Sequence, residues 1–182
     1  IEGIRQGSNL SLDESVAAAK TLLGLSVSVS AADLLSLDPV NQAYASGSNA
    51  DKAKYLEIYA KSAQVANLLV VGGAAIQVAN ASAGMTSADA SLAMLRALAD
   101  TYADSRASGT VAEVRLDNAS FISTVFGNVQ SAQPIDNVAD VSTALSNVNG
   151  VVVQTVNELK QNVSALNSKS ALNTLVATEY AS

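Results

Sequence analysis

Two pairs of carboxylates are the residues of this chain best spaced for chemistry. Asp100 and Asp104 lie four residues apart, and so do Asp136 and Asp140, so that each pair would share one face of a helix. General acid–base catalysis by such a pair requires one carboxyl to be buried, because burial raises its pKa toward neutrality. Both pairs are surrounded by Ala, Ser, Asn or Arg, which is typical of a solvated helix face. We therefore expect both pairs to be structural and predict no catalytic residue.

The chain contains neither histidine nor cysteine. This excludes Ser-His-Asp and Cys-His catalysis, disulfides, and metal sites built from imidazole or thiolate. The glycine pair Gly72-Gly73 is not followed by the Lys and Ser/Thr of a phosphate-binding loop, and the spacing of an EF-hand is also missing. We therefore expect a protein that is not an enzyme and predict no metal site.

Aromatic rings and the glycine pair are the remaining features that could hold a ligand. Tyr55 and Tyr59 lie one helical turn apart, and the glycines fall later in the same predicted helix. The glycines indicate either a close helix contact, a kink, or room for a ligand. The rings are either core residues or the walls of a slot between helices, which could hold an apolar molecule such as a carotenoid-like pigment or a lipid. The candidate ligand-binding residues are Tyr55, Tyr59, Gly72, Gly73, Tyr102 and Phe126.

Composition limits the class of partner. Of the 182 residues, 49% are hydrophobic but only 4% aromatic, so that Ala, Val and Leu supply most of the apolar surface, which suits close helix packing. Charged residues make up 14%, below the roughly 25% of typical soluble domains. The net charge of −6 argues against nucleic acid and anionic membranes, both of which attract basic surfaces. We expect a protein partner or self-association through apolar helix faces.

The N-terminal part of the chain predicts two helices joined by an extended linker. Ser11 is followed three residues later by glutamate, which is a capping box, and Gly24 ends the helix that it opens. Residues 25–30 alternate apolar and polar side chains, so we expect a linker fixed by Val27 and Val29. An Asp-Pro pair at 38–39 predicts a cap and a short helix to about residue 45.

The middle of the chain predicts three more helices. Ser48 or Asn49 caps a helix whose apolar residues recur at three- and four-residue spacings as far as residue 76. Its apolar run, Val65–Ala79, is shorter than the roughly 20 residues that span a bilayer, so we expect a core helix and no transmembrane segment. Thr86 caps the next helix, and Asp117 is predicted to cap the one after it.

The C-terminal part carries the longest helical pattern. Apolar residues from Val138 to Leu166 recur at steps of three and four, and a last helix is predicted at Ser170–Tyr180. The whole pattern predicts an all-α fold, an elongated bundle of five to six helices of which two are long, forming one domain over residues 1–182. Because the chain begins Ile1-Glu2-Gly3, with neither Met nor a signal peptide, we expect a processed piece of a longer precursor.

Four short motifs in the N-terminal third carry a resemblance to a known family. They occur in the order Leu22–Leu25, Asp33–Pro39, Tyr59–Ala60 and Gln64–Asn67. Together they resemble a helical module of very large exported bacterial proteins, where it lies among adhesin-like, cadherin-like or calcium-binding repeats. The resemblance implies an exported domain, extracellular or at the cell surface, without catalytic residues. It does not imply calcium binding, because this chain has no acidic calcium repeat.

Two functions are compatible with these observations. The first is a non-enzymatic helical binding or structural module of an exported bacterial protein. The alternative is a carrier of a lipophilic small molecule, a pigment or lipid held between helices. The first predicts a packed interior and an apolar outer face, whereas the second predicts an apolar cavity.

Overall fold

The structure, a computed structural model, describes residues 11–25, 28–34, 38–108, 114–129 and 135–165. All regular secondary structure within these ranges is helical, which confirms the predicted all-α fold class. The α-helices are α2 (Leu12–Leu22), α3 (Ala31–Leu34), α4 (Pro39–Ala45), α5 (Asn49–Asn67), α6 (Gly73–Ala79), α7 (Ser87–Ala107), α8 (Ala119–Gly127) and α9 (Val138–Gln161). A π-helical turn, η1 (Leu68–Gly72), and two 3₁₀ turns, η2 (Ala81–Ala83) and η3 (Val163–Ala165), complete them.

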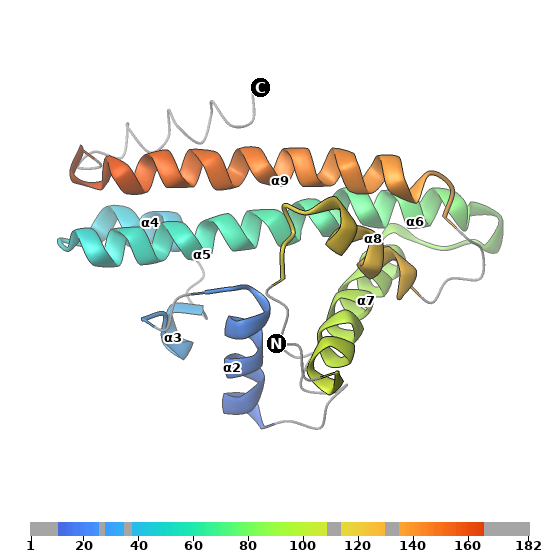
Figure 1. The fold of residues 1–182 in the computed structure, drawn as a ribbon, viewed down its shortest axis with the longest axis horizontal. Helices are drawn as coiled ribbons and strands as arrows, with labels where there is room; N and C mark the ends of the chain where they lie inside the picture. The colour runs from blue at the N-terminus through green and yellow to red at the C-terminus, as the bar shows by residue number, and fades with distance from the viewer. Residues whose placement is uncertain (1–10, 26–27, 35–37, 109–113, 130–134, 166–182) are drawn as a thin grey trace.

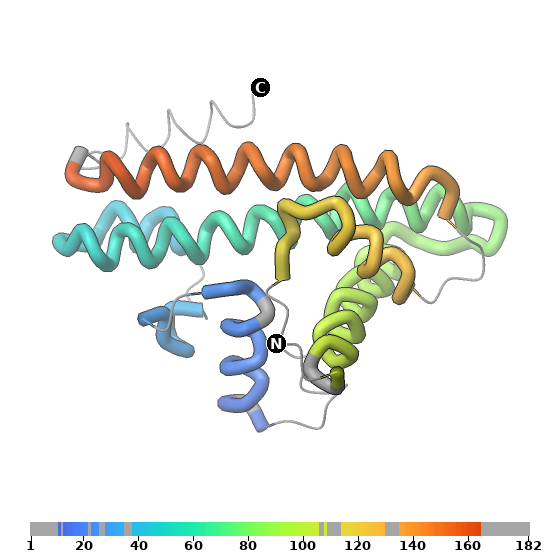
Figure 2. The backbone as a smooth tube through the Cα atoms, viewed as in Figure 1, coloured from blue at the N-terminus to red at the C-terminus, as the bar shows by residue number. Residues whose placement is uncertain are grey.

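Two long helical segments run side by side and form the backbone of the molecule (Figure 1). The first is α5, η1 and α6 in unbroken succession, 31 residues from Asn49 to Ala79. The second is α9, which runs antiparallel to it along most of its length (Figure 1). Helix α4 packs on α5, and α8 packs on α9. Helices α2 and α7 run across this pair on one side, as the tube in Figure 2 shows.

The predicted caps at Ser11 and Thr86 are confirmed. The Ser11 hydroxyl accepts from the Glu14 N–H at 3.3 Å, and the Glu14 carboxylate accepts from the Ser11 N–H at 2.9 Å. Asp89 accepts in the same way from the Thr86 N–H and hydroxyl at 3.3 and 2.6 Å. Each pair satisfies backbone N–H groups that a helix start leaves without partners.

The short helix at the predicted Asp-Pro pair is also confirmed. Asp38 Oδ1 accepts from the Asn41 N–H at 2.8 Å, and Pro39 is the first residue of α4. Of the two residues predicted to cap α5, Ser48 is the cap, since its hydroxyl accepts from the Asp51 N–H at 3.4 Å.

Between α2 and α4 the structure adds a helix that the sequence did not predict. Val29 of the predicted linker is fully buried, as expected, whereas Val27 lies outside the described residues. The single turn α3 follows, and it is too short for an apolar period to reveal it. It is held instead by a capping box in which Asp33 accepts from the Ser30 N–H and hydroxyl at 2.7 and 2.8 Å.

The predicted cap of α8 is wrong by one residue. Asn118 is the cap, because its side-chain oxygen accepts from the Phe121 N–H at 3.1 Å. The Asp117 carboxylate turns instead to the Arg115 guanidinium, at 3.3 and 3.4 Å. Either residue type can cap a helix, and the local ion pair decides which one does.

Helix α9 begins at Val138, where the predicted apolar pattern begins. Its N-cap is Asn137, with a φ of 58° in the left-handed region, so that Asp136 precedes the helix and shares no helical face with Asp140. The apolar pattern was predicted to continue to Leu166, but α9 ends at Gln161 and is followed by η3. Leu166 and the predicted helix at Ser170–Tyr180 lie outside the described residues.

The buried side chains form two main clusters along the long pair. The first joins η1 and α6 to α7, α8 and the first half of α9, and it includes Leu68, Ile76, Met94, Ile122 and Leu145. The second joins α4, the first half of α5 and the second half of α9, and it includes Ala43, Leu56, Ala60, Val156 and Leu159. A third, smaller cluster of Leu25, Val29 and Ile58 attaches the N-terminal segment to α5.

Candidate functional site

The glycine pair lies where η1 and α6 cross α7. A Cβ atom placed on Gly72 would lie 2.6 Å from Met94 Cε and 3.4 Å from Phe126 Cζ. One placed on Gly73 would lie 3.0 Å from Ser91 Oγ and 3.4 Å from the Ser91 Cα. The space above both glycines is therefore filled by side chains of α7 and α8 and by the α7 backbone. The sequence left open a close helix contact, a kink, or room for a ligand at the glycine pair. This geometry matches the close helix contact.

The π-helical turn beside the glycines is tied to the same crossing. The Ser91 hydroxyl donates to the Leu69 carbonyl at 3.3 Å. A π-helical turn widens the helix and displaces carbonyls from their usual partners. The Ser91 hydroxyl therefore supplies a hydrogen bond at the point where the helix widens, and it fixes α7 against η1.

Tyr102 and Phe126 both belong to the first core cluster. They are 7% and 4% exposed, and Phe126 fills the space next to Gly72. Four of the predicted ligand-binding residues therefore lie in or next to the first core cluster. They are Gly72, Gly73, Tyr102 and Phe126. Tyr59, by contrast, packs against the second cluster.

Tyr55 takes part in a polar network that joins α3 to α5. Its hydroxyl donates to Asp33 Oδ1 at 3.1 Å, and the Lys54 ammonium lies 3.3 Å from the same oxygen. Lys54 also pairs with Asp51 at 3.1 Å and lies 4.9 Å from the centre of the Tyr55 ring. Tyr55 and Lys54 line a pocket of about 260 Å³ together with Gln42, Ala45, Ser46 and Asp51.

Asp33 is the buried carboxylate of this network. Burial alone would raise its pKa, but the hydrogen bonds from Ser30, Tyr55 and Lys54 outweigh burial and hold the pKa at about 2. The bond to Asp33 in turn raises the pKa of the Tyr55 hydroxyl. A carboxylate held in its charged form and surrounded by donors serves as an anchor, since a general acid needs the opposite shift.

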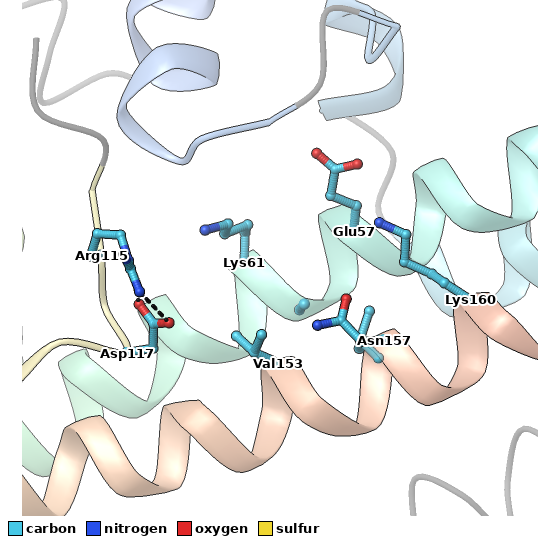
Figure 3. A pocket seen from close by; sticks show the side chains of 9 residues that line it. Glu57, Lys61, Arg115, Asp117, Val153, Asn157 and Lys160 are labelled. Atoms are coloured by element: carbon cyan, nitrogen blue, oxygen red, sulfur yellow. Dashed lines mark hydrogen bonds and ion pairs between the residues drawn. The ribbon is translucent and has the colours of Figure 1, made fainter.

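A charged cleft opens between α5 and α9 (Figure 3). It has a volume of about 250 Å³, and its apolar lining is Ala60, Val153 and Val156. Its charged and polar lining consists of Glu57 and Lys61 from α5, Asn157 and Lys160 from α9, and Arg115 and Asp117 from the segment before α8. In Figure 3, Lys61 and Arg115 lie toward one end of the cleft and Lys160 toward the other, with Asn157 between them.

Arg115 and Asp117 form an ion pair at one end of the cleft, with 3.3 Å between Arg115 Nε and Asp117 Oδ1 (Figure 3). The burial of Asp117 raises its pKa, but the hydrogen bond and charge of Arg115 outweigh this and lower it below the ordinary value. Lys61 adds to the lowering through its charge. Asp117 is thus ionised and already paired, which leaves the two lysines as the cations that face the open cleft.

Neither of the two carboxylate pairs considered for acid–base catalysis lies in a buried site. Asp100 and Asp104 are exposed on α7, and Asp104 accepts from the Asn128 amide at 3.4 Å. Asp100 lines a pocket of about 150 Å³ with Ala93, Arg96 and Asn128. Asp136 and Asp140 are exposed at the start of α9. Among the described residues, no group of three or more acidic side chains is placed to hold a metal ion.

The outer face of the long pair is free of charge over much of its length. Residues 62–79 and 141–157 contain no Asp, Glu, Lys or Arg. These two stretches are neighbours, because the Asn67 amide donates to Asn149 Oδ1 at 3.1 Å. Their exposed apolar side chains, called here the uncharged flank, are Ala66, Val70, Val71, Ala74 and Val78 of the first stretch and Ala144, Val148 and Val151 of the second. Val70 and Val78 are 70% and 78% exposed.

The first of these stretches belongs to the one described helix that is long and apolar enough to cross a membrane. That helix is Asn49–Ala79, and the mean hydropathy of its most apolar window is 1.4. The expectation of no transmembrane segment used the shorter run Val65–Ala79, so length no longer supports it. Gly72, Gly73 and Ile76 of this helix are buried, but only 28% of its most apolar window is buried, and a core helix of a soluble protein can have the same length and composition.

Sequence reasoning missed both polar sites, the Asp33 network and the charged cleft. Glu57 and Lys61 stand four residues apart and were visible as a pair, but Lys160 is about a hundred residues away and joins them only through the packing of α9 on α5. Ser30 and Asp33 form a capping-box spacing, and this was the available signal for α3.

Comparison of the chain with protein-family models, with curated proteins and with solved structures gave no match.

Proposed function

We propose that this chain is a non-enzymatic helical module of an exported bacterial protein, and that it associates through its uncharged flank. The observation that carries the proposal is the exposure of Val70, Val78 and Val148 on two adjacent helical stretches without charge. Val70, Ala74 and Val78 repeat every four residues, which forms a ridge that fits the groove of another helix. Exposed apolar surface of this kind marks sites of protein interaction.

A second copy of the chain is the partner that the flank fits. Two chains of net charge −6 repel one another over most of their surface. The flank is the region where two copies can meet without burying an unpaired charge, and removing such a charge from water would be costly. A membrane fits less well, since an anionic bilayer repels an acidic chain and attracts basic flanking residues.

Sedimentation equilibrium over a range of concentrations tests this association, in 0.5 M salt so that the repulsion is screened. We expect a concentration-dependent dimer, and we expect Val70→Ser with Val148→Ser to weaken it about tenfold or more, because each valine side chain then fails to bury its apolar area. Leu92→Ser is the matched control, because Leu92 is an exposed apolar residue of α7 outside the flank. A monomer at every concentration, or a dimer indifferent to the flank variant, would contradict the proposal.

The exported location rests on the resemblance of the N-terminal third to modules of exported proteins. Protease treatment of intact source cells, followed by immunoblotting for this chain, tests it. We expect digestion of the chain while a cytosolic marker survives. Protection of both proteins until the cells are lysed would overturn the export proposal and leave the association proposal standing.

A carrier of a lipophilic small molecule is the second candidate. It is supported by the apolar composition and by the two long helical segments that lie side by side. It is favoured less, because Met94 and Phe126 fill the space next to Gly72, Tyr102 is buried in the same core cluster, and the three described pockets are lined with charged groups. An absorption spectrum and an organic extract of natively purified protein test it: a bound pigment or lipid would support the carrier, and a colourless, lipid-free sample would exclude it.

A further inference from the structure

The charged cleft between α5 and α9 concentrates positive charge in an acidic protein. Lys61, Arg115 and Lys160 line it, which is three of the ten Lys and Arg residues of the chain. Glu57 and Asp117 supply two negative charges, so three cations and two carboxylates leave one net positive charge. We propose that this cleft binds a small organic monocarboxylate, with its carboxylate group at one of the cationic side chains and its apolar body on the floor.

The position of the two lysines supports an anionic ligand. Within the part of the chain that the structure describes, no hydrogen bond or ion pair is formed by Lys61 or Lys160. They project from different helices into the same cleft, on either side of Asn157 (Figure 3). Glu57, which lies between them in this view, offsets one of these two positive charges, and an anionic ligand would offset the other. The Asn157 amide adds a neutral donor between the two.

The floor of the cleft supports an organic ligand rather than an inorganic ion. Ala60, Val153 and Val156 present apolar surface between the charged groups. Burying an alkyl group on this surface contributes to binding, and an inorganic phosphate gains nothing from it. The charge of the lining also favours a monocarboxylate over phosphate, because the two charges of a phosphate dianion would exceed the single net positive charge of the cleft. A volume of about 250 Å³ accommodates a short-chain acid.

Titration of the ¹⁵N-labelled chain, followed by its amide resonances at low ionic strength, tests the proposal. The probe is sodium butyrate, and the comparisons are inorganic phosphate, 1-butanol and sodium chloride. We expect butyrate to produce saturable shifts at residues 57–61 and 153–160. Phosphate, which lacks the apolar body, and butanol, which lacks the charge, are each expected to bind at least about tenfold more weakly.

Two variants separate the site from a general effect of charge. Lys61→Gln with Lys160→Gln is expected to weaken butyrate binding by about tenfold or more, since charge-assisted hydrogen bonds are lost. Lys20→Gln removes one positive charge from α2, which does not line the cleft, and is expected to leave binding unchanged. Neither lysine of the cleft is buried, so the amide spectrum of the double variant is expected to keep its native dispersion.

Three results would overturn the proposal. The first is shifts of equal size in sodium chloride, which would mean ionic strength alone. The second is phosphate binding as tight as butyrate, which would mean that the cleft recognises charge without an apolar body. The third is a natively folded double variant that binds butyrate as the wild type does. Each of these is independent of whether the chain dimerises through its uncharged flank.

Discussion

Gly72 and Met94 are in contact where η1 crosses α7, and a Cβ atom on Gly72 would lie 2.6 Å from Met94 Cε. Met94 is fully buried, so its side chain has little space into which it can move. The missing side chain at residue 72 is therefore what allows α7 and α8 to pack against the long helix. Because Met94 and Phe126 both belong to the first core cluster, their contact with Gly72 also positions this cluster against η1.

Replacing Gly72 with leucine is expected to lower the free energy of unfolding by about 2–3 kcal/mol, because overpacking a filled core forces neighbouring side chains and helices apart. Urea denaturation measures this. The matched control is Gly150→Leu in α9, where a Cβ atom would meet nothing within 4 Å. Leucine has the higher helix propensity, so the control is expected to raise stability by about 0.5 kcal/mol. An equal response of the two glycines would show that residue 72 is not a packing contact.

Asp33 is expected to make stability depend on pH in the acid range. Its pKa is lowered from 3.8 to about 2 in the folded chain, so its contribution is present above pH 4 and is lost as the pH falls from about 4 to 2. Asp33→Asn is expected to lower the free energy of unfolding at pH 7 by about 1 kcal/mol, once solvent screening of the Lys54 pair is allowed for.

Urea denaturation of wild type and Asp33→Asn at pH 7, 4 and 2 checks this prediction. The difference between the two is expected to become small at the lowest pH, where Asp33 is about half protonated in the folded chain and almost fully protonated in the unfolded chain. Asp136→Asn serves as the control, since Asp136 is exposed and precedes α9. A constant difference at every pH would mean that Asp33 contributes by packing and not by its charge.

Asn149 is a buried hydrogen-bonding residue at the crossing of α5 and α9. Its amide donates to the Leu116 carbonyl at 2.7 Å, and its side-chain oxygen accepts from Asn67. Asn149→Ala is expected to cost about 2 kcal/mol, because it leaves the buried carbonyl of Leu116 without a partner. The exposed Asn147, two residues away, is the control, and Asn147→Ala is expected to change stability by less than about 0.5 kcal/mol. Thermal unfolding of both variants measures the two changes in stability, and equal changes would contradict the role of the Asn149 side chain.

Replacing Gln64 is expected to raise the stability of the fold, whereas replacing Asn149 lowers it. It is fully buried, and no hydrogen bond to its Oε1 atom occurs in the described structure, while its amide makes one long bond of 3.4 Å to the Asn149 carbonyl. Gln64→Leu is expected to raise the free energy of unfolding by about 1 kcal/mol, since an apolar group of similar size replaces a desolvated oxygen. A loss of stability in the same denaturation experiment would show that this oxygen has a partner, such as a bound water.

Much of the fold could be predicted because the signals are local. The capping boxes at Ser11 and Thr86 and the glycine at residue 24, whose φ is 59°, depend on residues within one turn of one another. Asn118 and Asp117 show the limit of this reasoning. Both are good capping residues, and the choice depends on an ion pair to Arg115 that no pattern of caps contains.

Local patterns in the sequence are enough to establish the helical class of this protein and to exclude catalysis and metal binding by histidine or cysteine. Helix periodicity, caps and the absence of histidine and cysteine are properties of the chain, and they hold whichever helices meet. Only the tertiary structure decided that α9 lies against α5. That contact brings Lys160 into the same cleft as Lys61 and sets Asn149 against Gln64. Its physical reason is the fit of small side chains such as Ala60 against Val156, and such a fit depends on shapes that residue spacing does not encode.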